Sequence, residues 1–162
     1  MELVATLLTD FPLDEARFHG LLRDLAQSSL AGAISPQGLQ ARHSFGDASR
    51  DLAPRDILVR VERATKAPPE AIHELANVGF RPLHAVMVHT DGDEDSREDA
   101  WALTHLYAEE LRGWILTRYL DYATAEARTG STEGLLHVPL TGGAKGDKAV
   151  LLASSTLDWL AP

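Results

Sequence analysis

The residues His89–Asp99, HTDGDEDSRED, place six carboxylates within eleven positions. Carboxylates this close together can hold a divalent cation, carry out acid–base chemistry or favour the start of a helix. A calcium loop of the EF-hand type needs glycine at its sixth position and glutamate at its twelfth. With Asp91 at the first position, these two positions hold Ser96 and Ala102. The spacing therefore predicts no metal site, with a looser calcium or magnesium site as the alternative.

Helix initiation accounts for more of the same residues. The Asp-Gly pair at 91–92 is typical of a turn. Asp95 or Ser96 is then expected to cap a helix whose first turn contains Glu98 and Asp99. Acidic side chains at that end of a helix complement its dipole, so the sequence predicts a solvated, charged helix start.

The charge of the chain suggests a partner for this acidic stretch. The formal net charge is −9, and residues 82–162 hold 13 acidic and 6 basic residues, a net charge of −7. Binding to nucleic acid needs clustered cations, so it is not expected. An acidic surface instead attracts a basic protein. The residues expected to bind it are Asp91, Asp93, Glu94 and Asp95, with Trp101, Trp114 and Tyr122 as aromatic anchors.

The histidines offer weaker candidates for catalysis. His105 and Glu109 lie four residues apart in a helical pattern, which would place a base beside a carboxylate. His84 and His89 lie five residues apart in a predicted strand and are expected to point to opposite faces of a sheet. Either histidine would act as a base in an enzyme, with Arg60 binding an anion. No serine-nucleophile or phosphate-binding motif is present.

The pattern of apolar residues predicts an α+β fold. The expected order is β-α-β-β-α-β, typical of a ferredoxin-like antiparallel sheet with both helices on one face, followed by a long helix, a β-hairpin and a short C-terminal helix. The expected strands are 2–9, 41–46, 56–64, 83–90, 135–140 and 149–153, and the expected helices are 12–25, 68–79, 97–128 and 155–160.

The composition is that of an ordinary globular protein, with 44% hydrophobic and 24% charged residues, and it predicts one domain spanning residues 1–162. The chain has no cysteine, which excludes disulfides and thiolate chemistry. Glu2 stands where a signal peptide carries positive charge, and no apolar run approaches the roughly 18 residues that cross a bilayer. We therefore expect a cytoplasmic protein that does not bind membranes.

These observations favour a non-enzymatic protein-binding module, such as an inhibitor, an immunity-type protein or an adaptor, that binds a basic partner without a cofactor. The alternative is an enzymatic or ligand-binding ferredoxin-like domain with a histidine-containing pocket between the sheet and the long helix. A second alternative is a homo-oligomeric scaffold. The helix predicted at 97–128 has apolar residues on more than one side, because Trp101, Leu116 and Leu120 lie off its main stripe. This pattern predicts a homodimer that forms through that helix.

Overall fold

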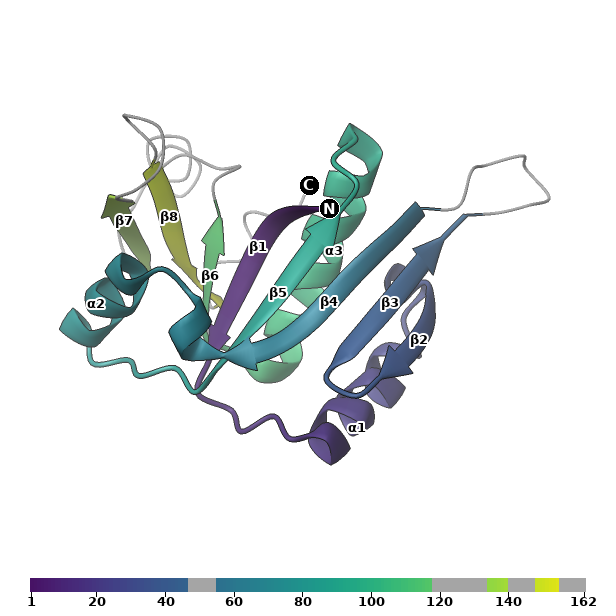
Figure 1. Cartoon of the computed structure of the whole chain (residues 1–162), viewed down its shortest axis with the longest axis horizontal. Helices are drawn as coiled ribbons and strands as arrows, with labels where there is room; N and C mark the ends of the chain where they lie inside the picture. The colour runs from purple at the N-terminus through teal and green to yellow at the C-terminus, as the bar shows by residue number, and fades with distance from the viewer. Residues whose placement is uncertain (47–54, 118–133, 140–147, 155–162) are drawn as a thin grey trace.

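A computed structural model describes residues 1–46, 55–117, 134–139 and 148–154. These residues form one antiparallel sheet of eight strands in the order β2-β3-β4-β5-β1-β6-β8-β7 (Figure 1). The strands are β1 (Glu2–Thr9), β2 (Ala33–Gln37), β3 (Gln40–Phe45), β4 (Arg55–Arg63), β5 (His84–Thr90), β6 (Trp114–Thr117), β7 (Leu135–Pro139) and β8 (Lys148–Ala153). The helices are α1 (Glu15–Leu25), α2 (Pro69–Asn77) and α3 (Glu94–Leu111), with short 3-10 helices η1 (Ser29–Ala31) and η3 (Ala64–Lys66).

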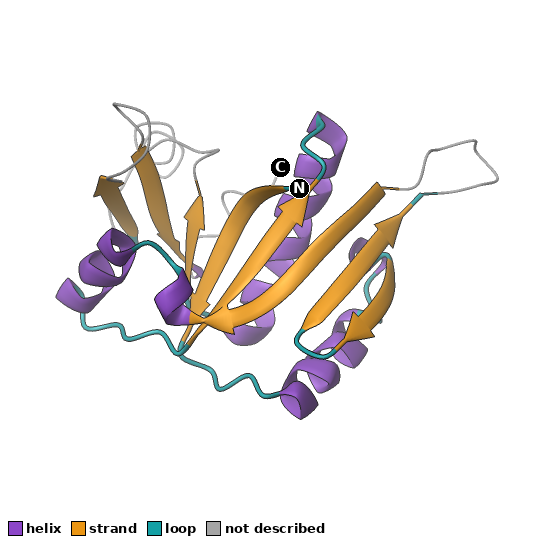
Figure 2. Ribbon diagram, in the orientation of Figure 1, coloured by secondary structure: helices purple, strands orange, loops and turns teal. Residues whose placement is uncertain are grey.

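Alternation along the strands divides the core into two layers. Leu7 and Leu8 are both fully buried, but they point to opposite faces of the sheet. Leu7 belongs to a cluster that contains Phe18 of α1 and Tyr107 of α3. Leu8 belongs to a second cluster with Leu75 of α2. We call the side beneath α1 and α3 the helical face and the other side the open face, since α2 covers only its β6–β8 end (Figure 2).

Most of the predicted elements are confirmed. The strands predicted at 2–9, 41–46, 56–64 and 83–90 correspond to β1, β3, β4 and β5, and the predicted hairpin is the antiparallel pair β7–β8. The first two predicted helices correspond to α1 and α2. The structure is therefore α+β with an antiparallel sheet, as expected from the period-two and period-3.6 patterns.

The ferredoxin-like order is not confirmed. The sheet has eight strands, including β2, which was not predicted. β1 lies between β5 and β6 and is antiparallel to both. The two helices expected on one face lie on opposite faces, because α1 packs in the first core cluster and α2 in the second.

The helix predicted at 97–128 is confirmed up to Leu111 and is wrong at residues 112–117. The chain turns at Arg112, with φ of 58°, and at Gly113, with φ of 138°, and then enters the sheet as β6. The prediction of a homodimer rested on an uninterrupted helix, and Leu116 in fact lies on a strand. Dimerisation itself stays a prediction. Residues 118–128 and the helix predicted at 155–160 lie outside the described residues.

Gly113 provides a test of this turn. A Cβ at residue 113 would overlap the backbone carbonyl oxygen of Leu8, and its φ is unfavourable for any L side chain. We expect Gly113→Ala to lower the free energy of unfolding by about 2–4 kcal/mol, because β6 would have to move away from β1. Urea denaturation followed by circular dichroism measures this change.

Gly20→Ala is the matched control. Gly20 lies within α1, and the nearest atom to an added Cβ is Nη2 of Arg23 at 3.7 Å. This change should increase stability by roughly 0.5–1 kcal/mol, since alanine is the better helix former. Equal effects of the two substitutions would contradict the described turn.

Candidate functional site

The predicted acidic stretch forms the start of α3, and its cap differs from the prediction. Asp93, rather than Asp95 or Ser96, is the cap: its side chain accepts a hydrogen bond from the Ser96 backbone N–H at 2.6 Å. The hydrogen bonds from Ser96 lower the pKa of Asp93, so the cap stays ionised. The side chain of Ser96 is buried beneath this turn. The first turn of α3 is therefore fixed against the rest of the protein.

Two arginines attach the start of α3 to the sheet. Arg55 of β4 contacts Asp99 through Nη2 at 2.7 Å and donates a second hydrogen bond from Nε at 2.9 Å. The hydrogen bond with Asp99 raises the pKa of Arg55. Arg97 of α3 contacts Glu2 of β1 at 3.4 Å. These pairs hold the helix start against both β1 and β4.

We call the start of α3, together with the charged residues around it, the acidic surface. It has seven carboxylates and two arginines, a net side-chain charge of −5, and most of the carboxylates are exposed. Within the described parts of the chain, no three histidine, aspartate or glutamate side chains lie close enough together to hold a metal ion. The acidic surface consists of Glu2, Asp91, Asp93, Glu94, Asp95, Glu98 and Asp99, with Arg55 and Arg97.

The predicted aromatic anchors Trp101 and Trp114 pack against different core clusters. Trp101 is half-buried on α3, packs against the core and contacts the ring of His105 edge-on, with centroids 5.4 Å apart. Trp114 is half-buried on β6 and packs against the other core cluster. Tyr122 lies outside the described residues. Glu109 is exposed near the C-terminal end of α3, four residues after His105.

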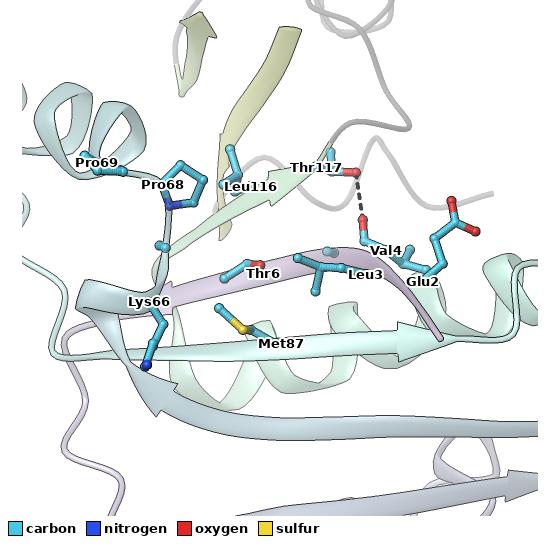
Figure 3. Close-up of a pocket in the computed structure, with 12 residues that line it drawn as sticks. Glu2, Leu3, Val4, Thr6, Lys66, Pro68, Pro69, Met87, Leu116 and Thr117 are labelled. Atoms are coloured by element: carbon cyan, nitrogen blue, oxygen red, sulfur yellow. Dashed lines mark hydrogen bonds between the residues drawn. The ribbon is translucent and has the colours of Figure 1, made fainter. Parts of the chain in front are cut away.

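The open face contains a hollow of about 680 Å³. Figure 3 shows Leu3, Thr6 and Met87 around it on β1 and β5, with Leu116 on β6 and Pro68 just before α2. Lys66 and Glu2 lie at opposite ends of it in the same view. The lining residues are Glu2, Leu3, Val4, Ala5, Thr6, Lys66, Ala67, Pro68, Pro69, Met87, Leu116 and Thr117.

A second, more polar hollow of about 410 Å³ lies beside β3 and β4. Register partners in an antiparallel pair point to the same face, so Arg60 of this hollow neighbours Met87 of the first. His89 is paired with Leu58 on one side and Leu3 on the other, and therefore lies between the two hollows. Both hollows lie across the sheet from α3, whereas the sequence placed a pocket between the sheet and the long helix. The second hollow is lined by Ser35, Pro36, Gln37, Gln40, Ala41, Arg42, Leu58 and Arg60.

The two strand histidines occupy different surroundings. His84 and His89 point to opposite faces, as predicted, because five positions separate them on β5. His84 accepts a hydrogen bond from the Leu13 backbone N–H at 3.3 Å. Burial lowers the pKa of His89, and the neighbouring charge of Arg60 lowers it further. His89 is therefore mostly neutral at pH 7.

A buried histidine–tyrosine pair was not predicted. His43 of β3 and Tyr107 of α3 are both fully buried, and the hydroxyl of Tyr107 lies 2.8 Å from Nε2 of His43. Nδ1 of His43 lies 2.7 Å from the carbonyl oxygen of Ala31, which can only accept. Nδ1 therefore carries the proton, and Nε2 accepts from Tyr107. Burial lowers the pKa of His43 and raises that of Tyr107, so both groups are neutral and the pair joins α3 to β3.

Comparisons with protein-family models, curated proteins and solved structures found no match for this chain. None of the helices in the described ranges is both long enough and apolar enough to span a membrane.

The His43–Tyr107 pair predicts a pH dependence of stability. The pKa of His43 is lowered in the folded protein, so the unfolded chain binds a proton below about pH 6.5 while the folded protein does not. The free energy of unfolding should therefore decrease as the pH falls from 7 toward 5. His43→Gln should reduce this dependence, with His89, whose pKa is also lowered, contributing the remainder, as measured by urea denaturation at several pH values.

Two further variants test the cause. Tyr107→Phe at pH 8 should lower stability by about 1–3 kcal/mol, because Nε2 of His43 loses its buried donor. His73→Gln, at an exposed position on α2, should leave both the stability and its pH dependence unchanged. An unchanged pH dependence in His43→Gln would contradict the assigned role of the pair.

Proposed function

We propose that the protein is a non-catalytic binding protein that recognises a basic protein partner through the acidic surface. The observation that supports this most directly is the local net charge of −5, carried by side chains that α3 and β1 present to solvent. A surface of one sign speeds the encounter with a partner of opposite sign and orients the approach. The chemistry fits an inhibitor, an immunity-type protein or an adaptor equally well.

The way the acidic surface is held favours binding over simple solvation. Asp93 is fixed by its capping bond to Ser96, while Arg55 and Arg97 connect the helix start to two strands. A charged surface that is already ordered loses less conformational entropy on association than a flexible loop does. Asp91, Glu94, Asp95 and Glu98 are exposed, and their charges are available to a partner.

The proposal predicts which carboxylates speed association with the basic partner. The variant Glu94→Gln/Asp95→Asn/Glu98→Gln removes three exposed charges but keeps the Asp93 cap and the Asp99–Arg55 pair. It should slow association with the basic partner by about tenfold at low salt and reduce the salt dependence of the rate. The partner is first isolated from cells of the source organism on the immobilised wild-type protein, and rates are then measured by stopped-flow fluorescence.

The control variant changes the net charge equally but at another place. Asp24→Asn/Glu109→Gln/Glu110→Gln removes three exposed carboxylates from the ends of α1 and α3, away from the acidic surface. Association should then slow much less than with the first variant. If both triple variants slow association equally, the rate depends only on the net charge of the protein, and the acidic surface is not a binding site.

A further inference from the structure

We propose that the hollow on the open face binds an amphiphilic anion, an alkyl chain that ends in a carboxylate, with the chain against β1, β5 and β6 and the carboxylate near Lys66 and Arg60. This site lies on a different part of the molecule from the acidic surface, apart from Glu2, which contributes to both. It would hold a small molecule rather than a protein partner.

The lining of the hollow suits an apolar chain. Val4 and Ala5 belong to the core cluster of the helical face, but six other lining residues have apolar side chains, among them Leu3, which is 44% exposed, and the partly exposed Met87. Its volume of about 680 Å³ lies within the roughly 300–1,000 Å³ typical of small-molecule sites. An alkyl chain placed here would remove the exposed surface of Leu3 and Met87 from water, which is favourable.

Lys66 is the cationic side chain among the residues that line the hollow, and Arg60 lies beside the hollow on β4, so an anion is favoured at this end although Glu62 and Glu70 lie nearby. Lys66 and Arg60 are exposed, and no carboxylate of the described residues forms an ion pair with either. Glu2, at the opposite end, is paired with Arg97. Glu62 lies on the same face of β4 as Arg60 and partly offsets its charge. A carboxylate near the Lys66 end would gain charge-assisted hydrogen bonds that a neutral head group cannot make.

The position of Arg60 favours one orientation of the ligand. Arg60 is the register partner of Met87, so its side chain lies on the same face of the sheet, next to Met87, which lines the hollow. Lys66 is the last residue of η3, and its side chain lies on the same side of the hollow as Met87 (Figure 3). Lys66 therefore lies at one end of the apolar surface, while Arg60 lies beside it on β4, level with Met87 and outside the residues that line the hollow. An arginine and a lysine together suit a carboxylate, because the guanidinium binds its two oxygens and the ammonium adds a point charge.

The two methionines provide a specific probe of this site. The chain contains only Met1 and Met87, and Met87 lines the hollow. In protein labelled with ¹³C at the methionine methyl groups, dodecanoate added below its micelle concentration should shift the Met87 signal saturably, with Met1 as internal reference. 1-Dodecanol should bind about tenfold more weakly, because it lacks the charge.

Two pairs of variants test the assignment. Lys66→Glu should raise the dodecanoate Kd about tenfold or more, while Arg23→Glu on the exposed side of α1 should leave it unchanged. Leu3→Ser should weaken binding, while Leu30→Ser, exposed to 54% on η1, should not. The proposal is overturned if dodecanoate does not move the Met87 signal, or if Lys66→Glu and Arg23→Glu bind it equally.

Discussion

The fold depends on the pairing of β1 with two strands that are far apart in the sequence. β5 pairs with one side of β1 and β6 with the other, so β1 joins the β2–β5 part of the sheet to the β6–β8 part. A strand in this position must bury both faces, and Leu7 and Leu8 are fully buried on opposite sides. The other end of β1 is different: its register shifts between Leu3 and Ala5, and Leu3 stays exposed on the open face. The hollow forms where α2 leaves that end of β1 uncovered.

The sequence predicted the elements whose pattern is local and regular. β4 alternates buried and exposed side chains, and β1 is a continuous apolar run, so both were recognised. β2 was missed because it is an exposed edge strand of five residues that contains Pro36. β6 was missed because Leu111 and Ile115 continue the spacing of a helical stripe across Gly113. Only the tertiary contact of Gly113 with Leu8 shows why the helix must end there.

The candidate sites were predictable to different degrees. The exposure of the acidic residues followed from their density, because so many carboxylates cannot be buried without partners. The cap was misplaced by two or three residues, since Asp93, Asp95 and Ser96 are all good capping residues and spacing alone does not choose among them. The hollow and the His43–Tyr107 pair were missed because their residues come from separate elements. Only the strand order places Leu3, Met87 and Leu116 side by side.

Glu2 belongs both to the acidic surface, proposed to bind a cationic partner, and to the hollow, proposed to bind an anion. It lines the hollow, pairs with Arg97 of the acidic surface and lies so close to Gly92 that a Cβ there would come within 2.8 Å of its carboxylate. Glu2 and Lys66 lie at opposite ends of the hollow, and Glu2 is paired with Arg97 while Lys66 has no carboxylate partner among the described residues. At physiological salt, charges in solvent act over about 8 Å, so a bound group responds to its immediate neighbours more than to the net charge of −9. Under the two proposals, a cationic partner would bind at the acidic surface and the carboxylate of an anion in the hollow would lie nearer Lys66 than Glu2.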